Sequence, residues 1–177
     1  MHNPPVASIL TERLRLVPLN VDNAERLASV LGDAAIYEFI GGQPDSEDEL
    51  RERYRWLAQA EPDSSEERWF NWVVEEASTA TAIGTVQATV SGAEAEVAWI
   101  IGVEWQGQGF AKEAAGALVQ WLLSRGVKTI SANVHPDHAA SAAVASAAGL
   151  LATGDRVDGE VVWRRQFQSA VAPLPSS

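Results

Sequence analysis

Residues 97–112 read VAWIIGVEWQGQGFAK, and this stretch decides the fold. An apolar run ending at Ile101 predicts a strand, Gly107 and Gly109 mark a loop, and a helix is predicted to follow at once. Glycine lets the backbone approach a ligand closely, and the first N–H groups of a helix lack intrahelical partners. With the helix dipole and Lys112, such a helix start predicts a phosphate or diphosphate site; a tight turn without a ligand is the competing interpretation.

The pattern on both sides of this stretch predicts an α+β protein with one central sheet. Strands are predicted at residues 13–19, 69–75, 83–90, 96–101, 129–134 and 161–167, and helices at residues 21–31, 46–60, 110–125 and 138–148. Three consecutive strands at hairpin spacing predict an antiparallel meander. We expect one domain over residues 9–167, with flexible termini at residues 1–8 and 168–177.

The composition describes an ordinary globular protein and excludes several kinds of site. The chain has 177 residues, 46% of them hydrophobic, and no cysteine, which excludes disulfides, thiolate metal sites and a cysteine nucleophile. The net charge of −11 disfavours nucleic acid and anionic membranes as partners. Because the chain also has no secretory pattern and no long apolar run, we expect a cytoplasmic protein.

Residues 45–67 concentrate the negative charge, with nine carboxylates against three arginines. Two interpretations stay open for this segment. It is either a solvated helix face with its loop, or a rim that attracts a cationic amine.

The loop sequence matches neither the P-loop nor the dinucleotide-binding glycine pattern, so the glycine pair alone does not decide between a phosphate site and a tight turn. Residues 106–111, QGQGFA, resemble the Q/R-x-x-G-x-G/A signature of GNAT acetyltransferases. TERLRLVPL at residues 11–19 and HPDHAASAAVASAAGL at residues 135–150 resemble the RimJ/RimL branch, the ribosomal-protein N-terminal acetyltransferases. The resemblance covers residues 9–167. It implies the GNAT fold: a mostly antiparallel, twisted sheet of about six to seven strands, flanked by about four helices and splayed between its two central strands.

The resemblance also implies acetyl-CoA as co-substrate and no metal. In the family, loop amides hold the CoA diphosphate, which assigns cofactor contacts to Gln106, Gly107, Gln108, Gly109, Phe110, Ala111 and Lys112. Pantetheine pairs with strand amides in the gap of the sheet, here at Ile101 and Val103. Gly102 between them is either a bend where the ligand comes close or a packing glycine.

Two departures from the family pattern affect the site. His138 stands where the family has an asparagine that contacts CoA, and an imidazole can also donate a hydrogen bond. The predicted helix at residues 138–148 lacks the tyrosine that many members use to protonate the leaving thiolate, since only Tyr37 and Tyr54 are present in the chain. Ser141 matches a serine of the branch and is the candidate donor to the sulfur, with helix capping as its other role.

Carboxylates near the thioester are the candidate bases. Glu96, on the strand beside the thioester, is the first candidate and Glu160 the second; each is otherwise an ordinary exposed carboxylate. A strand amide near Ile101 would polarise the thioester carbonyl. Most of the seven tryptophans are expected in the core, while Trp56 and Trp72 are candidates for the wall of an acceptor pocket.

The implied reaction is acetyl transfer to a primary amine by direct attack in a ternary complex. The acceptor is either a protein N-terminus or a small molecule. A CoA-binding sensor or structural module without turnover is the alternative, which His138 and the missing tyrosine keep open. Homodimers are common in the branch and are a further partner expectation.

Overall fold

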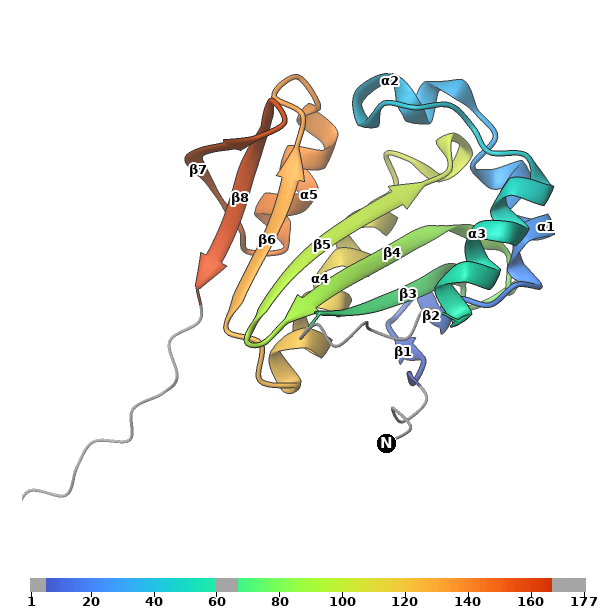
Figure 1. Ribbon diagram of the computed structural model, residues 1–177, viewed down its shortest axis with the longest axis horizontal. Helices are drawn as coiled ribbons and strands as arrows, with labels where there is room; N and C mark the ends of the chain where they lie inside the picture. Colours follow the sequence, from blue (N-terminus) through green and yellow to red (C-terminus); the bar gives the residue numbers. More distant parts are fainter. Residues whose placement is uncertain (1–5, 60–66, 167–177) are drawn as a thin grey trace, which may run out of the picture.

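One eight-stranded sheet organises residues 6–59 and 67–166, the part of the chain that the computed structural model describes (Figure 1). The strand order is β1-β2-β3-β4-β5-β6-β8-β7. The strands are β1 Ile9–Leu10, β2 Leu14–Pro18, β3 Glu67–Glu76, β4 Ala82–Ser91, β5 Glu94–Ile101, β6 Thr129–Val134, β7 Leu151–Val157 and β8 Glu160–Gln166. Neighbouring strands are antiparallel except for β5 and β6, which are parallel.

Helices cover both faces of the sheet. They are α1 Asn23–Val30, η1 Ala34–Ile36, α2 Tyr37–Ile40, α3 Glu47–Gln59, η2 Val103–Trp105, α4 Phe110–Ser124 and α5 Ala139–Ala147. Trp72 and Val74 of β3 pack in one core cluster with α4 and α5, whereas Val73 between them packs with α1 and α3. Because side chains alternate along a strand, these clusters lie on opposite faces of the sheet. No helix in the described ranges is long and apolar enough to cross a membrane.

The expected α+β fold and the meander of β3, β4 and β5 are confirmed. Strands β1 and β7 and the short helices η1 and α2 were not predicted. The two residues of β1 are too few for a pattern, and β7 is exposed on both faces, so its sequence carries no hydrophobic alternation.

The described part of the predicted flexible N-terminus contacts the core, while its flexibility stays a prediction. Val6 packs against the core, and the carbonyl of Ala7 accepts a hydrogen bond from Nε1 of Trp72 at 3.3 Å. The remaining residues of that prediction, 1–5 and 168–177, lie outside the described chain, as does Phe167 of the predicted last strand.

A gap opens between the two central strands, as expected. β5 pairs with β6 only where Glu94–Glu96 meet Thr129–Ser131. Beyond Glu96 the two strands diverge, β5 toward the glycine loop and β6 alongside β8 (Figure 1). The gap therefore closes beside Glu96 and opens at the end of β5 that precedes α4.

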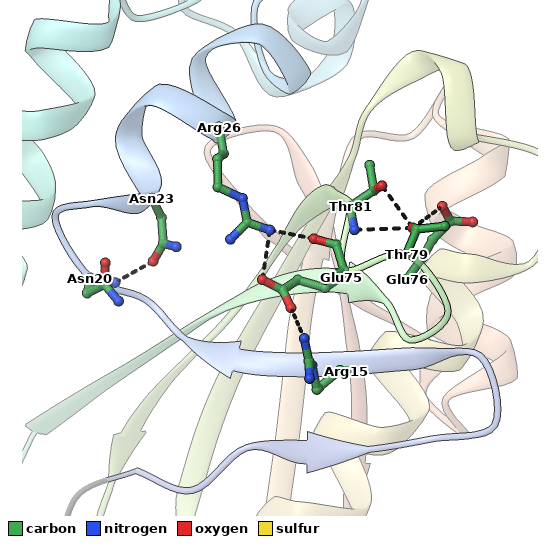
Figure 2. Close-up of polar contacts among 9 residues, drawn as sticks. Arg15, Asn20, Asn23, Arg26, Glu75, Glu76, Thr79 and Thr81 are labelled. Atoms are coloured by element: carbon green, nitrogen blue, oxygen red, sulfur yellow. Dashed lines mark hydrogen bonds and ion pairs between the residues drawn. The ribbon is translucent and has the colours of Figure 1, made fainter.

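A buried carboxylate joins α1 to the first strands of the sheet (Figure 2). Glu75 of β3 is 4% exposed and pairs with Arg15 of β2 at 2.9 Å and with Arg26 of α1 at 2.8 Å. Arg26 also donates to the carbonyl of Ala80 at 2.7 Å. Since a buried charge is costly unless it is paired, these contacts fix α1 on its face of the sheet.

Candidate functional site

Backbone groups of β5 point into the gap. The N–H of Gly102 donates to the carbonyl of Ile83 in β4 at 2.8 Å. Hydrogen-bonding direction alternates along a strand, so the N–H and C=O groups of Trp99 and Ile101 point away from β4, toward the gap. The Ile101 carbonyl accepts a hydrogen bond from Nε2 of Gln106 at 2.9 Å. The N–H groups of Trp99 and Ile101 are therefore the donors available there, and Trp99 was not among the predicted site residues.

The glycine loop opens directly into α4. Gly107 and Gly109 have φ values of +74° and +84°, a left-handed conformation that L side chains rarely adopt. Gly109 is the N-cap residue of α4, and its carbonyl oxygen accepts the first intrahelical hydrogen bond, from the backbone N–H of Glu113. The N–H groups of the first turn, at residues 110–112, therefore lack intrahelical partners, an arrangement that is suited to binding an anion.

One cavity of about 660 Å³ joins the glycine loop to the open end of the gap. The predicted site residues that line it are Ile101, Val103, Gln106, Gly107, Gly109, Phe110, Ala111, Lys112, His138 and Ser141. Residues of η1 and α2 form the opposite wall. Val103 lies in η2 rather than on the strand, so it continues the wall of the cavity and not the row of strand amides.

Gln108 does not line this cavity. Its Nε2 donates to the carbonyl of Glu104 at 3.2 Å, and its own carbonyl accepts from Nη1 of Arg13 at 3.0 Å. The side chain and the backbone carbonyl of Gln108 therefore both bind protein groups and stabilise the loop.

Gly102 is a packing glycine. A Cβ at this position would lie 2.8 Å from Cγ1 of Val30 and 3.0 Å from Cε3 of Trp105. These are protein atoms, so close packing of the protein requires the glycine, and no ligand is needed to explain it.

His138 begins α5 and stacks on a ring from the other wall of the cavity. Its ring lies 4.6 Å from that of Phe39 in α2, with an interplanar angle of 17°, and His135 contacts the same ring at 5.4 Å. Burial and the neighbouring His135 lower the pKa of His138 from its ordinary value, and Glu38 opposes this in part. These surroundings therefore favour the neutral form of the imidazole. Phe39 was not among the predicted site residues, because α2 lies far from α5 along the chain.

The lowered pKa of His138 predicts a pH effect on stability. The unfolded chain binds this proton more tightly than the folded chain, so the stability contribution is complete above about pH 6.5 and is lost as the pH falls through the folded pKa. We expect the free energy of unfolding to fall more between pH 7 and pH 5 in the wild type than in His138→Asn. Urea unfolding at both pH values measures the difference; parallel losses in the two proteins would contradict it.

Ser141 and Glu96 occupy different places around the gap. Ser141 lies in the first turn of α5 and lines the cavity, and its hydroxyl has no hydrogen-bond partner within the described ranges. Helix capping does not explain it, since the N-cap residue is His138. Glu96 lies where the gap closes, accepts from Nδ2 of Asn133 at 3.3 Å and lines a second cavity of about 450 Å³. The structure does not bring the two side chains into one cavity.

The other candidates lie away from both cavities. Glu160 pairs with Val157 in the β7–β8 hairpin. The hydroxyl of Tyr37 donates to the carbonyl of Leu31 at 3.1 Å, and burial raises the pKa of Tyr54 to about 12. Neither tyrosine lines the cavity of the glycine loop.

Of the two tryptophans that were candidates for the wall of an acceptor pocket, Trp72 belongs to the core instead. This residue is fully buried in the core and packs edge-on against Trp121 at 4.9 Å. Trp56 is 57% exposed and contacts Trp69 at 5.4 Å, outside the cavity of the glycine loop.

In the acidic segment at residues 45–67, Asp45 pairs with Arg53 and Glu47 with Arg51, whereas residues 61, 63 and 66 lie outside the described chain. Attraction of an amine to this segment stays a prediction.

No group of three or more potential metal ligands comes together within residues 6–59 and 67–166.

Comparison with known proteins shows the domain family to which this fold and site correspond. The family model of the acetyltransferase (GNAT) domain matches residues 13–151. Comparison with curated proteins by sequence gives no significant match.

Several solved structures share the fold at low identity. A GNAT-family acetyltransferase from Bacillus anthracis is 17% identical, with a TM-score of 0.76 over 90% of this chain and 98% of its own. RimL, a ribosomal-protein α-N-acetyltransferase in complex with coenzyme A, is 16% identical, with a TM-score of 0.76 over 91% and 98%. AAC(6')-Ib in complex with paromomycin and acetyl-CoA is 18% identical, with a TM-score of 0.72 over 88% and 94%.

Proposed function

Because this chain belongs to the GNAT acetyltransferase family, we propose that it transfers the acetyl group of acetyl-CoA to a primary amine. One observation carries the proposal: the first turn of α4, whose N–H groups lack intrahelical partners, and the strand residues Trp99 and Ile101 line the same cavity. A molecule with a diphosphate at one end and an amide-bearing arm at the other fits both parts. The open space around Gly107, where a Cβ would meet no atom within 4 Å, leaves room for the diphosphate.

In this proposal the residues of the gap hold the thioester and move protons. The amine nitrogen attacks the thioester carbonyl, the C–N bond forms and the C–S bond breaks; the amine loses one proton and the thiolate gains one. The N–H of Ile101 would polarise the carbonyl, and the hydroxyl of Ser141, which lines the cavity, would donate to the sulfur. Glu96 lies five residues before Ile101 on β5 and lines the other cavity, so it would take the amine proton through a chain of waters that leads to the closed end of the gap.

Two classes of acceptor fit the proposal. The first class is a protein N-terminus, since RimL acts on the α-amine of a ribosomal protein. The second is a small molecule, since the solved structure of AAC(6')-Ib contains a bound aminoglycoside. An α-amine has a pKa of about 7.7–8.0 and a lysine amine one of about 10.4, so a weakly basic amine needs less help from a base.

The second candidate function is a CoA-binding module without turnover. It is favoured by the stack of His138 on Phe39, because His138 stands at the position of the family's asparagine. Cytoplasmic location and a homodimer stay predictions.

An assay of thiol release tests the proposed function. The protein is incubated with acetyl-CoA and a panel of N-terminal peptides, aminoglycosides and amino-acid amines, and free thiol is measured together with the mass of the acceptor. We expect release that depends on the amine and an acceptor heavier by one acetyl group. Tight CoA binding without turnover on any amine would instead support the binding module.

Replacing the proposed base should change the pH profile of the reaction. Glu96→Gln should lower kcat/KM by about 10²-fold or more below the pKa of the amine, where deprotonation is needed, and much less above it. Steady-state kinetics over this pH range measures the effect. Glu94→Gln is the matched control, since Glu94 lies two residues earlier on β5 and lines the same second cavity. Equal effects of both substitutions at every pH would contradict the role of Glu96.

A further inference from the structure

A single arginine of the first hairpin reaches the glycine loop. Arg13 precedes β2, and its Nη1 donates to the carbonyl oxygen of Gln108 at 3.0 Å. Its guanidinium also lies over the ring of Phe110, 4.5 Å from the ring centroid. Both contacts fall where the loop becomes α4, so residues distant in sequence meet at the start of α4.

Glu113, in the first turn of α4, fixes the orientation of Arg13. Its Oε2 accepts from Nε of Arg13 at 2.7 Å, and its Oε1 accepts from the backbone N–H of Arg13 at 2.9 Å and from the hydroxyl of Thr11 at 2.6 Å. Burial raises the pKa of the Glu113 carboxyl, but these hydrogen bonds and the guanidinium outweigh burial and lower the pKa overall. A charged carboxylate with three donors holds a planar guanidinium in one orientation.

The contact to Gln108 determines where the next amide points. In a trans peptide the C=O and N–H groups point in opposite directions. Since the Gln108 carbonyl points at Arg13, the N–H of Gly109 points away from Arg13, and Gly109 lines the cavity. Gly107 and Gly109 have no side chains that resist rotation of the peptides between them, so the restraint comes from hydrogen bonds of Gln108: its side chain donates to Glu104, and Arg13 holds its carbonyl.

We propose that Arg13 is a positioning residue for the diphosphate of the donor: it holds the Gln108 carbonyl and thereby aims the N–H of Gly109 into the cavity. The inference rests on the proposed function, because it takes the diphosphate of CoA as the ligand. Arg13 does not line the cavity, so it acts through the loop and not by touching the ligand.

Two ligands that differ in the diphosphate test the inference. Arg13→Ala should weaken CoA binding by about tenfold to a hundredfold, the loss expected when one hydrogen bond to a charged group is removed. Pantetheine carries the same thiol-bearing arm without the diphosphate, and its affinity should not change. Arg13→Lys keeps the charge but cannot hold Gln108 and Glu113 together, so it should resemble Arg13→Ala. NMR titration measures both dissociation constants.

Arg125→Ala is the matched control. Arg125 lies 4.1 Å over the ring of Trp121 at the other end of α4, so this substitution removes the same charge and the same kind of ring contact. It should leave both affinities unchanged. If Arg13→Ala does not fold, as judged by thermal unfolding, Glu113→Gln takes its place; it loosens Arg13 and should show the same selective loss of CoA affinity.

Equal losses for CoA and pantetheine, recovery in Arg13→Lys, or an equal loss in Arg125→Ala would each overturn the inference. Its failure can be told apart from failure of the proposed function. A wild-type protein that binds CoA but transfers no acetyl group refutes the function alone. Unchanged CoA binding in Arg13→Ala refutes the inference alone, and a wild type that does not bind CoA refutes both.

Discussion

Gly109→Val should weaken CoA binding by about 100-fold or more, because the loop would lose at least two charge-assisted hydrogen bonds to the diphosphate. Gly109 has a φ of +84°, which a β-branched residue adopts only under strain, and a Cβ there would lie 3.3 Å from Nη2 of Arg13. The loop should relax to a negative φ, and its amides would then turn away from the ligand. Calorimetric titration with CoA measures the loss.

Gly126→Val separates the loss of ligand from the loss of stability. Gly126 follows the other end of α4 with a φ of +86°, and a Cβ there would meet no atom within 4 Å. Both substitutions should therefore destabilise the fold by about 1–2 kcal/mol. Only Gly109→Val should affect CoA binding. Unchanged binding in Gly109→Val would refute the diphosphate site at the start of α4.

Glu75→Ala should lower the free energy of unfolding by about 3 kcal/mol, the low end of the range for breaking a buried ion pair. The carboxylate is buried between Arg15 and Arg26, whereas their side chains are 43% and 41% exposed and can regain water (Figure 2). Removing it leaves two like charges without their shared partner and detaches α1 from β3. For a domain of this size, the midpoint of thermal unfolding should fall by about 6–12 °C.

Glu76→Ala is the control for this prediction. Glu76 follows Glu75 on β3. Its side-chain carboxylate accepts a hydrogen bond from the hydroxyl of Thr79 at 3.3 Å, within the same β3–β4 hairpin. Its loss should change the free energy of unfolding by no more than about 0.5 kcal/mol. Urea unfolding measures both variants. Equal, small effects would mean that α1 is held by its apolar contacts alone.

The sequence predicted the elements whose signals are local. The helix at α4 was predicted at residues 110–125, where apolar residues recur at helical spacing; in the structure Ala114, Ala115, Leu118 and Leu122 form the buried stripe of this helix. The meander follows from three alternating runs at hairpin spacing. Strand β7 escaped prediction because a strand that is exposed on both faces has no alternation to detect.

Single side chains were harder to place than elements. Trp72 and Trp56 have the same chemistry, yet one is fully buried in the core and the other is 57% exposed. Gly102 fits a ligand bend or a packing contact equally well until Val30 and Trp105 are placed beside it. In each case the neighbour that decides the role belongs to another part of the fold.

The sequence by itself determined the loop of left-handed glycines and the unpaired amides at the start of α4, because a few consecutive residues set these features of the backbone. Only the tertiary structure decided how the gap between β5 and β6 meets that loop, that Arg13 holds the Gln108 carbonyl, and that Phe39 stacks on His138. Each of these contacts joins residues from separate elements. Their distances depend on the topology of the sheet and the packing of its helices, which no local pattern of residues encodes.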